Sequence, residues 1–260
     1  ASHYGSGNAT QNVAVGVVSL FSVTSGGGNV AIGYNSQNGL TSGSYNVGLG
    51  RDSLAANITG NYNVAIGSQS MVTSTGTSGN TAVGYNTLNV TTGSGHVAIG
   101  EYALDANTTG TENTAVGSDA LTDNTTGVEN VAFGESALAN NTTANNNTAL
   151  GRTALFTNTT GAANTALGHQ AMRQNTTGGS NVAVGNAALF ANTTGTNNVG
   201  IGYDALNANT TASNNTAVGF CALRNNTTGV PNTAIGTNAL KNNTTGNSNT
   251  ALGYNALTNN

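Results

Sequence analysis

The chain has 260 residues, of which only 5% are charged, and a formal net charge of −4. Ordinary soluble domains carry about 25% charged residues. Its five basic residues are scattered, whereas phosphate neutralisation needs clustered Lys and Arg. No apolar run reaches the roughly 18 residues of a membrane span, and the single Cys221 excludes an intrachain disulfide framework. The composition therefore argues against nucleic-acid binding and membrane insertion.

A five-residue phrase, Asn-(Val/Thr)-Ala-(aliphatic)-Gly, recurs along the sequence. Its closing glycines follow a constant 17-residue period, as from Gly100 to Gly117, and only the interval from Gly84 to Gly100 is shorter, by a single residue. A fixed period of this kind is the signature of a repeat architecture. The closing glycines are Gly16, Gly33, Gly50, Gly67, Gly84, Gly100, Gly117, Gly134, Gly151, Gly168, Gly185, Gly202, Gly219, Gly236 and Gly253.

The first coils, in residues 1–95, keep the phrase but mostly lack the Asn-Thr-Thr-Gly segment of the later coils. We expect them to form a looser N-terminal part of one continuous repeat domain. The missing residue of the short coil falls in the turn around residues 91–95, where a loop can absorb it. The large apolar residue four places after the closing glycine is present at Leu20, Leu54, Met71 and Leu88 and is replaced at Gln37.

The later coils, in residues 96–260, are regular and read Gly-x-x-Ala-Leu-x-x-Asn-Thr-Thr-Gly-x-x-Asn-Thr-Ala-Val. Three positions are expected to carry the structure, namely the closing glycine, the leucine and the asparagine of the recurring phrase. Two successive coils supply Gly117, Leu121, Asn113, Gly134, Leu138 and Asn130 at these positions.

Alternation within the phrase indicates a β-strand, with Thr114 and Val116 on one face and Asn113, Ala115 and Gly117 on the other. Glycine and asparagine suit turns of positive φ, and two-helix repeats need about 33 residues or more. We predict an all-β fold, a parallel β-solenoid of about fifteen 17-residue coils. Each coil is expected to contain two short strands and two bends.

One leucine and one or two other aliphatic residues per coil bury too little apolar surface to stabilise an isolated thin coil. Backbone ladders, stacked asparagines and packing between chains are therefore expected to contribute. The small residue of each strand predicts a flat stripe where another chain could approach. This stripe includes Ala98, Ala115, Ala132, Ala149, Ala166, Ala183 and Gly200.

The phrase Asn-Val-Ala-Ile-Gly, at residues 29–33 and 63–67, resembles the repeats in the head domains of trimeric autotransporter adhesins. The fuller pattern with Asn-Thr-Thr-Gly is similar to repeats of phage tail-fibre proteins. The resemblance implies a left-handed β-roll wound as a homotrimeric rod. It also implies an extracellular location, on a cell surface or a virion.

No catalytic constellation is apparent, so we expect neither an enzyme nor a cofactor. Glu112 and Glu129 lie one repeat apart and should stack about 5 Å from each other; they are interpreted as a solvated bend or, alternatively, a cation site. His96 replaces the asparagine of the phrase, either as a hydrogen-bonded substitute or, in a trimer, as one of a ring of three. Cys221 has no histidine in its coil and is interpreted as an incidental thiol.

Aromatic residues follow the closing glycine in several coils and predict either packing over the bend or contacts to a glycan receptor. The glycan candidates are Tyr34, Tyr85, Tyr203 and Tyr254. Dense Asn-x-Thr sequons are interpreted as turn chemistry rather than as glycosylation sites.

The expected function is a non-enzymatic structural fibre, a rigid extracellular shaft or adhesin head for attachment. An alternative is a subunit that polymerises end to end into a filament. A further alternative is an ice-binding β-solenoid. This last alternative is disfavoured because Thr108 and Thr109 are expected to point to opposite sides of a strand.

Overall fold

The computed structural model describes residues 9–259, which contain fifteen three-residue strands and no helix. The strands are β1 (Val13–Val15), β2 (Val30–Ile32), β3 (Val47–Leu49), β4 (Val64–Ile66), β5 (Thr81–Val83), β6 (Val97–Ile99), β7 (Thr114–Val116), β8 (Val131–Phe133), β9 (Thr148–Leu150), β10 (Thr165–Leu167), β11 (Val182–Val184), β12 (Val199–Ile201), β13 (Thr216–Val218), β14 (Thr233–Ile235) and β15 (Thr250–Leu252).

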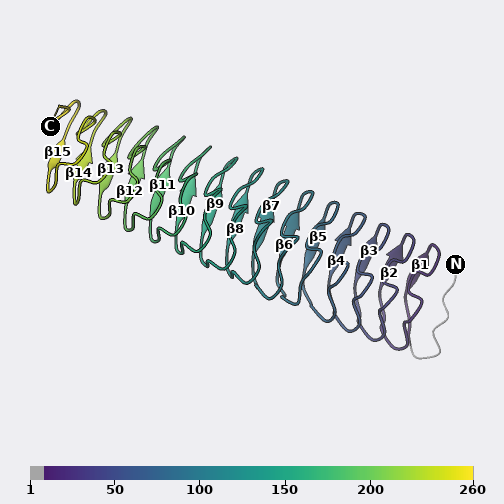
Figure 1. The fold of residues 1–260 in the computed structure, drawn as a ribbon. Coiled ribbons are helices and arrows are strands. Elements are labelled where there is room, and N and C mark those ends of the chain that lie inside the picture. The colour runs from purple at the N-terminus through teal and green to yellow at the C-terminus, as the bar shows by residue number, and fades with distance from the viewer. Residues whose placement is uncertain (1–8, 260) are drawn as a thin grey trace. The chain divides into compact units, whose positions relative to one another are not determined.

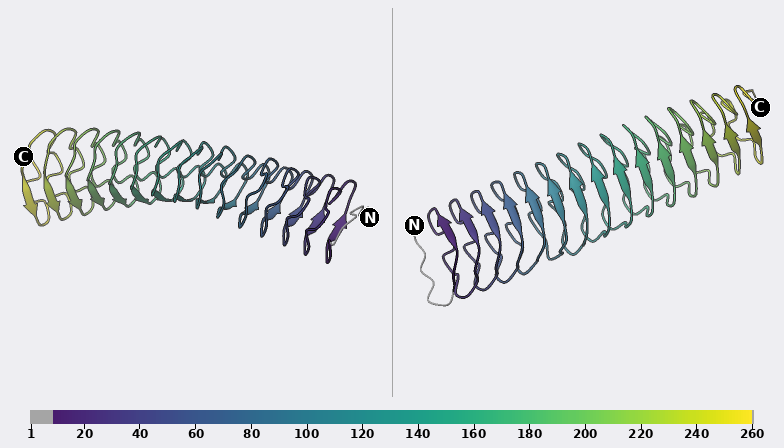
Figure 2. Two further views of the ribbon diagram at one scale, coloured as in Figure 1. Left: turned by 90° about the horizontal axis from the view of Figure 1, so that it is seen from below. Right: turned by 180° about the vertical axis from the view of Figure 1, so that it is seen from behind.

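The chain divides into two compact units, Ala1–Glu129 with β1 to β7 and Asn130–Asn260 with β8 to β15. Within each unit, every strand pairs in parallel with the next strand along the chain (Figure 1). Both views in Figure 2 show the strands of each unit following one another along one side of the coils. The predicted all-β parallel solenoid is confirmed.

The register of pairing equals the sequence period. Ala166 lies beside Ala149 on one neighbouring strand and beside Ala183 on the other. Equivalent residues of successive coils therefore stack within each unit. The short coil keeps this register across its missing residue, because Ala82 pairs with Ala98 and Ala98 pairs with Ala115.

The prediction of two strands per coil is wrong. Each coil contains one strand of three residues, and the remainder consists of turns and bends. Residues two and four places after the closing glycine have positive φ; in one coil they are Asp119 (φ 56°) and Leu121 (φ 53°). This backbone cannot continue a strand.

Leucine in the left-handed region costs about 1–2 kcal/mol. Leu121 is fully buried, and burying a leucine side chain contributes about 1.5–3 kcal/mol. Its counterpart Leu138 is also buried, has φ 53° and donates its N–H to the carbonyl of Ala154 at 2.9 Å. Burial and the hydrogen bond to the next coil together offset the backbone strain.

The closing glycines allow the chain to turn sharply after each strand. Gly117 and Gly134 have φ of +136° and +134°, a region that is essentially closed to other residues. A Cβ on Gly134 would lie 2.7 Å from the carbonyl carbon of Gly151 in the next coil. Glycine at this position therefore permits both the turn and the close stacking of coils.

The alternation predicted for the strands is confirmed, but the role given to the alanine stripe is wrong. Asn113 and Ala115 are buried, whereas Thr114 and Val116 are partly exposed. The strand alanines fill the coil interior and offer no surface to another chain. The interior has little room there, since a Cβ on Gly200 would lie 3.2 Å from Cγ of Leu189.

The first coils differ from the later ones in what fills the interior. Val23 and Leu40 occupy the place that asparagine takes in the Asn-Thr-Thr-Gly segment, and they form an apolar cluster with Leu20 and Ala31. An aliphatic interior thus replaces a polar one in these coils. The boundary expected near residue 95 stays a prediction.

Candidate functional site

The asparagines of the recurring phrase form a ladder inside the coils, here called the first asparagine ladder. Oδ1 of Asn164 accepts the backbone N–H of Asn181 at 3.0 Å, and Nδ2 of Asn164 donates to the carbonyl of Gly178 at 2.8 Å. Both ends of the buried amide are thereby satisfied. The ladder contains Asn12, Asn29, Asn46, Asn63, Asn80 and Asn113 in the first unit, and Asn130, Asn147, Asn164, Asn181, Asn198, Asn215, Asn232 and Asn249 in the second.

The asparagines of the Asn-Thr-Thr-Gly segment form the second asparagine ladder. Nδ2 of Asn175 donates to Oδ1 of Asn158 at 2.7 Å and to the carbonyl of Gly178 at 2.9 Å. The two ladders therefore meet on one carbonyl, because Asn164 also donates to Gly178. The second-unit members are Asn141, Asn158, Asn175, Asn192, Asn209, Asn226 and Asn243.

The stacked asparagines expected from the sequence are thus confirmed, and they connect each coil to the next. The members of the second ladder are also the asparagines of the Asn-Thr-Thr sequons. Asn158 and Asn175 are completely buried, so the side-chain amides of these two sequons are inaccessible in the folded coil.

Two columns of threonine follow the second ladder on the outside of the coils. In the inner column, Oγ1 of Thr159 donates to the carbonyl of Thr176 at 3.1 Å, and Oγ1 of Thr176 donates to that of Thr193 at 3.0 Å. The outer column is exposed in seven successive coils of the second unit. Its members are Thr143, Thr160, Thr177, Thr194, Thr211, Thr228 and Thr245.

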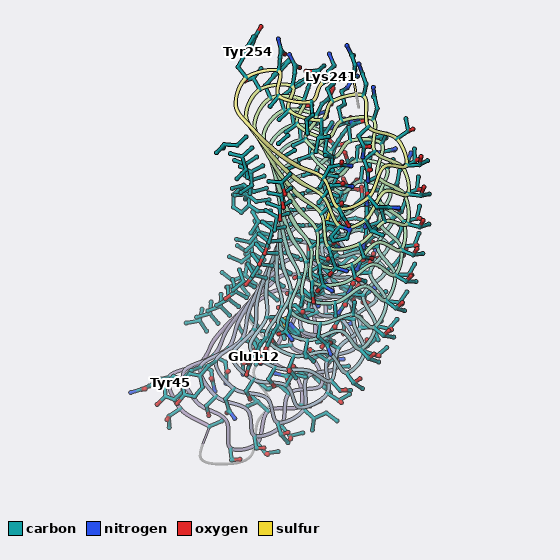
Figure 3. The ribbon with its side chains drawn as sticks, turned by 90° about the vertical axis from the view of Figure 1, so that its left-hand side faces the viewer. Tyr45, Glu112, Lys241 and Tyr254 are labelled. Atoms are coloured by element: carbon teal, nitrogen blue, oxygen red, sulfur yellow. The ribbon has the colours of Figure 1, made fainter. Side chains whose placement is uncertain are left out.

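The prediction that Thr108 and Thr109 point to opposite sides of a strand is wrong. Neither residue lies in a strand, and both are exposed. The Asn-Thr-Thr-Gly segment is a bend, so the strand alternation on which the prediction relied does not apply. Figure 3 shows a row of side chains with oxygen at their tips along this side of the coils.

The outward face of the strands carries an apolar column, formed by the third residue of each strand. In the second unit Phe133 is 52% exposed and Leu150 is 41% exposed. The first and third strand positions include no charged residue in any of the fifteen strands. Figure 3 shows a row of mostly carbon side chains opposite the oxygen-tipped row. The second-unit members are Phe133, Leu150, Leu167, Val184, Ile201, Val218, Ile235 and Leu252.

The two glutamates considered as a cation site occupy equivalent turns of the first unit. Both are exposed with φ 57°, and their N–H groups donate to carbonyls of Ser94 and Thr111 at 3.1 Å. Among residues 9–259 there is no cluster of three or more His, Cys, Asp or Glu able to hold a metal ion. Cation binding by Glu112 and Glu129 stays a prediction.

Other titratable groups are arranged as structural pairs. Arg224 Nε lies 3.1 Å from a carboxylate oxygen of Asp204, and Arg152 Nε lies 3.2 Å from Glu135. Burial raises the pKa of Asp105 even though Thr122 donates a hydrogen bond to it at 2.8 Å. Burial also raises the pKa of the Cys221 thiol, which disfavours the nucleophilic thiolate.

The aromatic candidates are all exposed but are not gathered into one site. Tyr203 stacks on Phe220 with ring centroids 5.4 Å apart, and Tyr85 contacts Tyr102 edge to face at 5.6 Å. Tyr34 and Tyr254 have no aromatic contact of this kind among the described residues. Glycan binding by these tyrosines stays a prediction.

One stacked aromatic pair was not predicted from the sequence. Tyr45 stacks on Tyr62 with centroids 5.3 Å apart and an interplanar angle of 7°. These tyrosines follow the bend before the recurring phrase, not the closing glycine. Their spacing of one full repeat was the signal that could have revealed them. Figure 3 labels Tyr45 at the edge of its coil.

No family model, curated protein or solved structure matches this chain. The part of the chain that the structure describes contains no pocket. Nor does it contain a helix of the length and apolar character needed to cross a bilayer.

Replacing Asn181 with Ala tests the first asparagine ladder. The change removes the acceptor for Asn198 N–H and the donor to Gly195 carbonyl, at 2.9 Å each. We expect the free energy of unfolding to fall by about 2–4 kcal/mol, because buried polar groups lose their partners.

Asn186→Ala is the matched control five residues further along, because Asn186 is exposed and its side chain hydrogen-bonds only to an exposed side chain, His169. It should change the unfolding free energy by less than about 0.5 kcal/mol. Chemical denaturation followed by circular dichroism measures both values. Equal stability of the two variants would contradict the role given to the ladder.

Proposed function

We propose that this chain is a non-enzymatic structural shaft of an extracellular fibre, of the kind found in phage tail fibres and bacterial surface adhesins. The observation that carries the proposal is that every coil is hydrogen-bonded to the next inside each unit. Backbone ladders, two asparagine ladders and the inner threonine column all run in this direction. Such bonding resists bending and stretching of the stack.

The distribution of side chains supports a mechanical rather than a chemical role. The interior is filled by alanine, leucine and hydrogen-bonded asparagine, which leaves no room for a substrate. The exposed carboxylates and tyrosines lie at individual bends and do not converge. Variable residues at those bends are well placed to contact a receptor, such as a surface glycan.

The apolar column favours assembly with further copies of the chain. Six of its eight second-unit members are between 37% and 77% exposed, so the column offers a continuous apolar surface to a partner chain. A second copy has the same spacing between coils and could match the column coil for coil. We propose a homotrimer, in which each chain contributes its outward strand face to a shared centre.

Placing charge on the apolar column should prevent this assembly. The double variant Leu150→Lys, Leu167→Lys puts two lysines on the outward strand face, where their burial against another chain is strongly unfavourable. We expect the mass in solution to change from that of three chains to that of one. Sedimentation equilibrium measures this mass, and circular dichroism verifies that the coils remain folded.

Thr160→Lys, Thr177→Lys is the control, because it adds the same charges to the exposed threonine side of the same coils. It should leave the trimer intact. A wild-type protein of monomeric mass would refute assembly through the apolar column. Particles of indefinite length in electron micrographs would instead favour the self-polymerising filament.

A second candidate function, ice binding, is favoured by the two threonine columns. The outer hydroxyls and methyls repeat once per coil over seven coils, at a spacing of about 4.8 Å. Hydrogen bonds hold the inner threonines in fixed positions. A rigid, uncharged array of this type can order water at its surface.

Thermal hysteresis tests this candidate. An ice-binding array predicts a freezing point below the melting point for the wild type, and loss of this gap in Thr177→Lys, Thr194→Lys. Asn186→Lys, which adds charge at an exposed position away from these columns, should retain the gap. Coincident freezing and melting points in the wild type would reject ice binding and leave the structural proposal intact.

A further inference from the structure

His96 interrupts the first asparagine ladder in the first unit and is completely buried. Its backbone N–H donates to Oδ1 of Asn80 at 2.9 Å, as an asparagine at this position would. The imidazole ring replaces the missing side-chain amide as hydrogen-bond acceptor and donor. It accepts the N–H of Asn113 at Nδ1, 3.2 Å away, and its Nε2 lies 2.9 Å from the carbonyl of Gly110.

These contacts require one neutral form of the ring. Because Nδ1 accepts a hydrogen bond from the Asn113 N–H, the ring's own proton lies on Nε2. The Nε2–H group then donates to the Gly110 carbonyl. Protonation of Nδ1 would place two donors against each other and would bury a positive charge. The geometry confirms the hydrogen-bonded substitute expected from the sequence, and it leaves neither nitrogen free for a ring of three histidines between chains.

The second asparagine ladder is interrupted at the same level. Ser74 and Thr91 occupy its positions in two successive coils, and the coil of Thr91 is the shortened one. Oγ1 of Thr91 accepts from Asn107 Nδ2 at 3.1 Å and from Gly93 N–H at 3.0 Å, and it donates to the Gly93 carbonyl at 3.5 Å. Ser74 Oγ donates to the carbonyl of Met71 in its own coil at 3.2 Å, so the second ladder lacks the side-chain bond that would join Ser74 to Thr91.

The surroundings offer a protonated ring no compensating charge. The polar groups that face His96 come from Asn80 in the preceding coil, and from Asn107, Gly110 and Asn113 in the following one. None of them titrates. The nearest carboxylate along the chain, Glu112, is exposed at its bend and lies against Gly95.

We propose that the segment from Gly84 to Asn113 is an acid-sensitive joint. Protonation of His96 breaks the hydrogen bond from the Asn113 N–H to Nδ1 of the ring and opens these coils locally. The other coils of the chain remain closed. Acidification would thus loosen the fibre at one defined place.

The direction of the pH dependence follows from proton linkage. Burial lowers the pKa of His96, although the hydrogen bond to the Gly110 carbonyl acts in the opposite direction. An opened segment exposes the ring, whose pKa then returns to about 6.5. The open form binds more protons below that pH, so closure is fully stable above about pH 6.5 and weakens as the pH falls.

Hydrogen exchange of the full chain at pH 7.5 and pH 5.0 tests the joint, with labelling times scaled for the intrinsic pH dependence of exchange. We expect opening of residues 91–113 to increase on acidification, by about tenfold for each pH unit below the open-form pKa and by no more than about 30-fold at pH 5.0. The amides of residues 165–218 in regular coils should show no such increase.

Two variants separate the joint from general acid sensitivity. His96→Asn restores the repeat residue and should remove the acid-induced opening. His169→Asn is the matched control, because His169 is exposed, and it should behave as the wild type. Equal opening of His96→Asn and wild type at pH 5.0, or equal protection of the wild type at both pH values, would overturn the proposal.

The imidazole titration provides a second readout that is independent of any variant. In NMR spectra of the wild type, His96 should titrate below the ordinary histidine pKa of about 6.5. A His96 pKa at or above that value would also overturn the proposal.

Discussion

The structure depends on hydrogen bonds between coils that satisfy a polar interior. A coil as short as one repeat is too thin to enclose an ordinary apolar core, so each interior amide must find hydrogen-bond partners in a neighbouring coil. The two asparagine ladders supply these partners with one geometry in the regular coils. An amide such as that of Asn164 accepts from the next coil and donates to it. Stability therefore comes from neighbouring coils, as in other repeat proteins.

The close stacking of the coils also determines which residues occupy the glycine, leucine and alanine positions of the repeat. The closing glycine turns the chain in a region of φ that excludes side chains. The leucine that fills the interior adopts a left-handed backbone, which a buried side chain and an inter-coil hydrogen bond make tolerable. Alanine faces that leucine because nothing larger fits. Size, rather than polarity alone, decides which strand residues point inward.

The parts of the fold that follow from periodicity were predictable from the sequence. Spacing fixed the solenoid, its register and the stacking of the asparagines. Three errors arose where periodicity is silent, and the first is the second strand expected in each coil. Strand alternation separates Ala115 from Val116 but does not say which faces inward, and the larger residue proves to be outside. Tandem threonines such as Thr108 and Thr109 suit a strand by propensity, yet the preceding asparagine holds them in a bend.

The two candidate surfaces, the apolar column and the threonine columns, depend on the orientation of the strand residues and on the threonine bend. The sequence therefore did not identify these surfaces. The apolar column became visible only once alanine was known to be buried, and the threonine columns only once the bend was known. His96 was recognisable as a substitution in the repeat, but its acid sensitivity depends on the donors around its ring.

Disulfide trapping between adjacent coils tests the stacking most directly. In a Cys221→Ser background, Thr160→Cys and Thr177→Cys place thiols at equivalent positions one coil apart, about 4.8 Å between backbones. This separation lies within the Cα range of a disulfide. We predict rapid intrachain oxidation of this pair and none for Thr160→Cys with Thr194→Cys, two coils apart. Failure of the first pair to oxidise, or equal oxidation of both pairs, would contradict the stacking of equivalent residues.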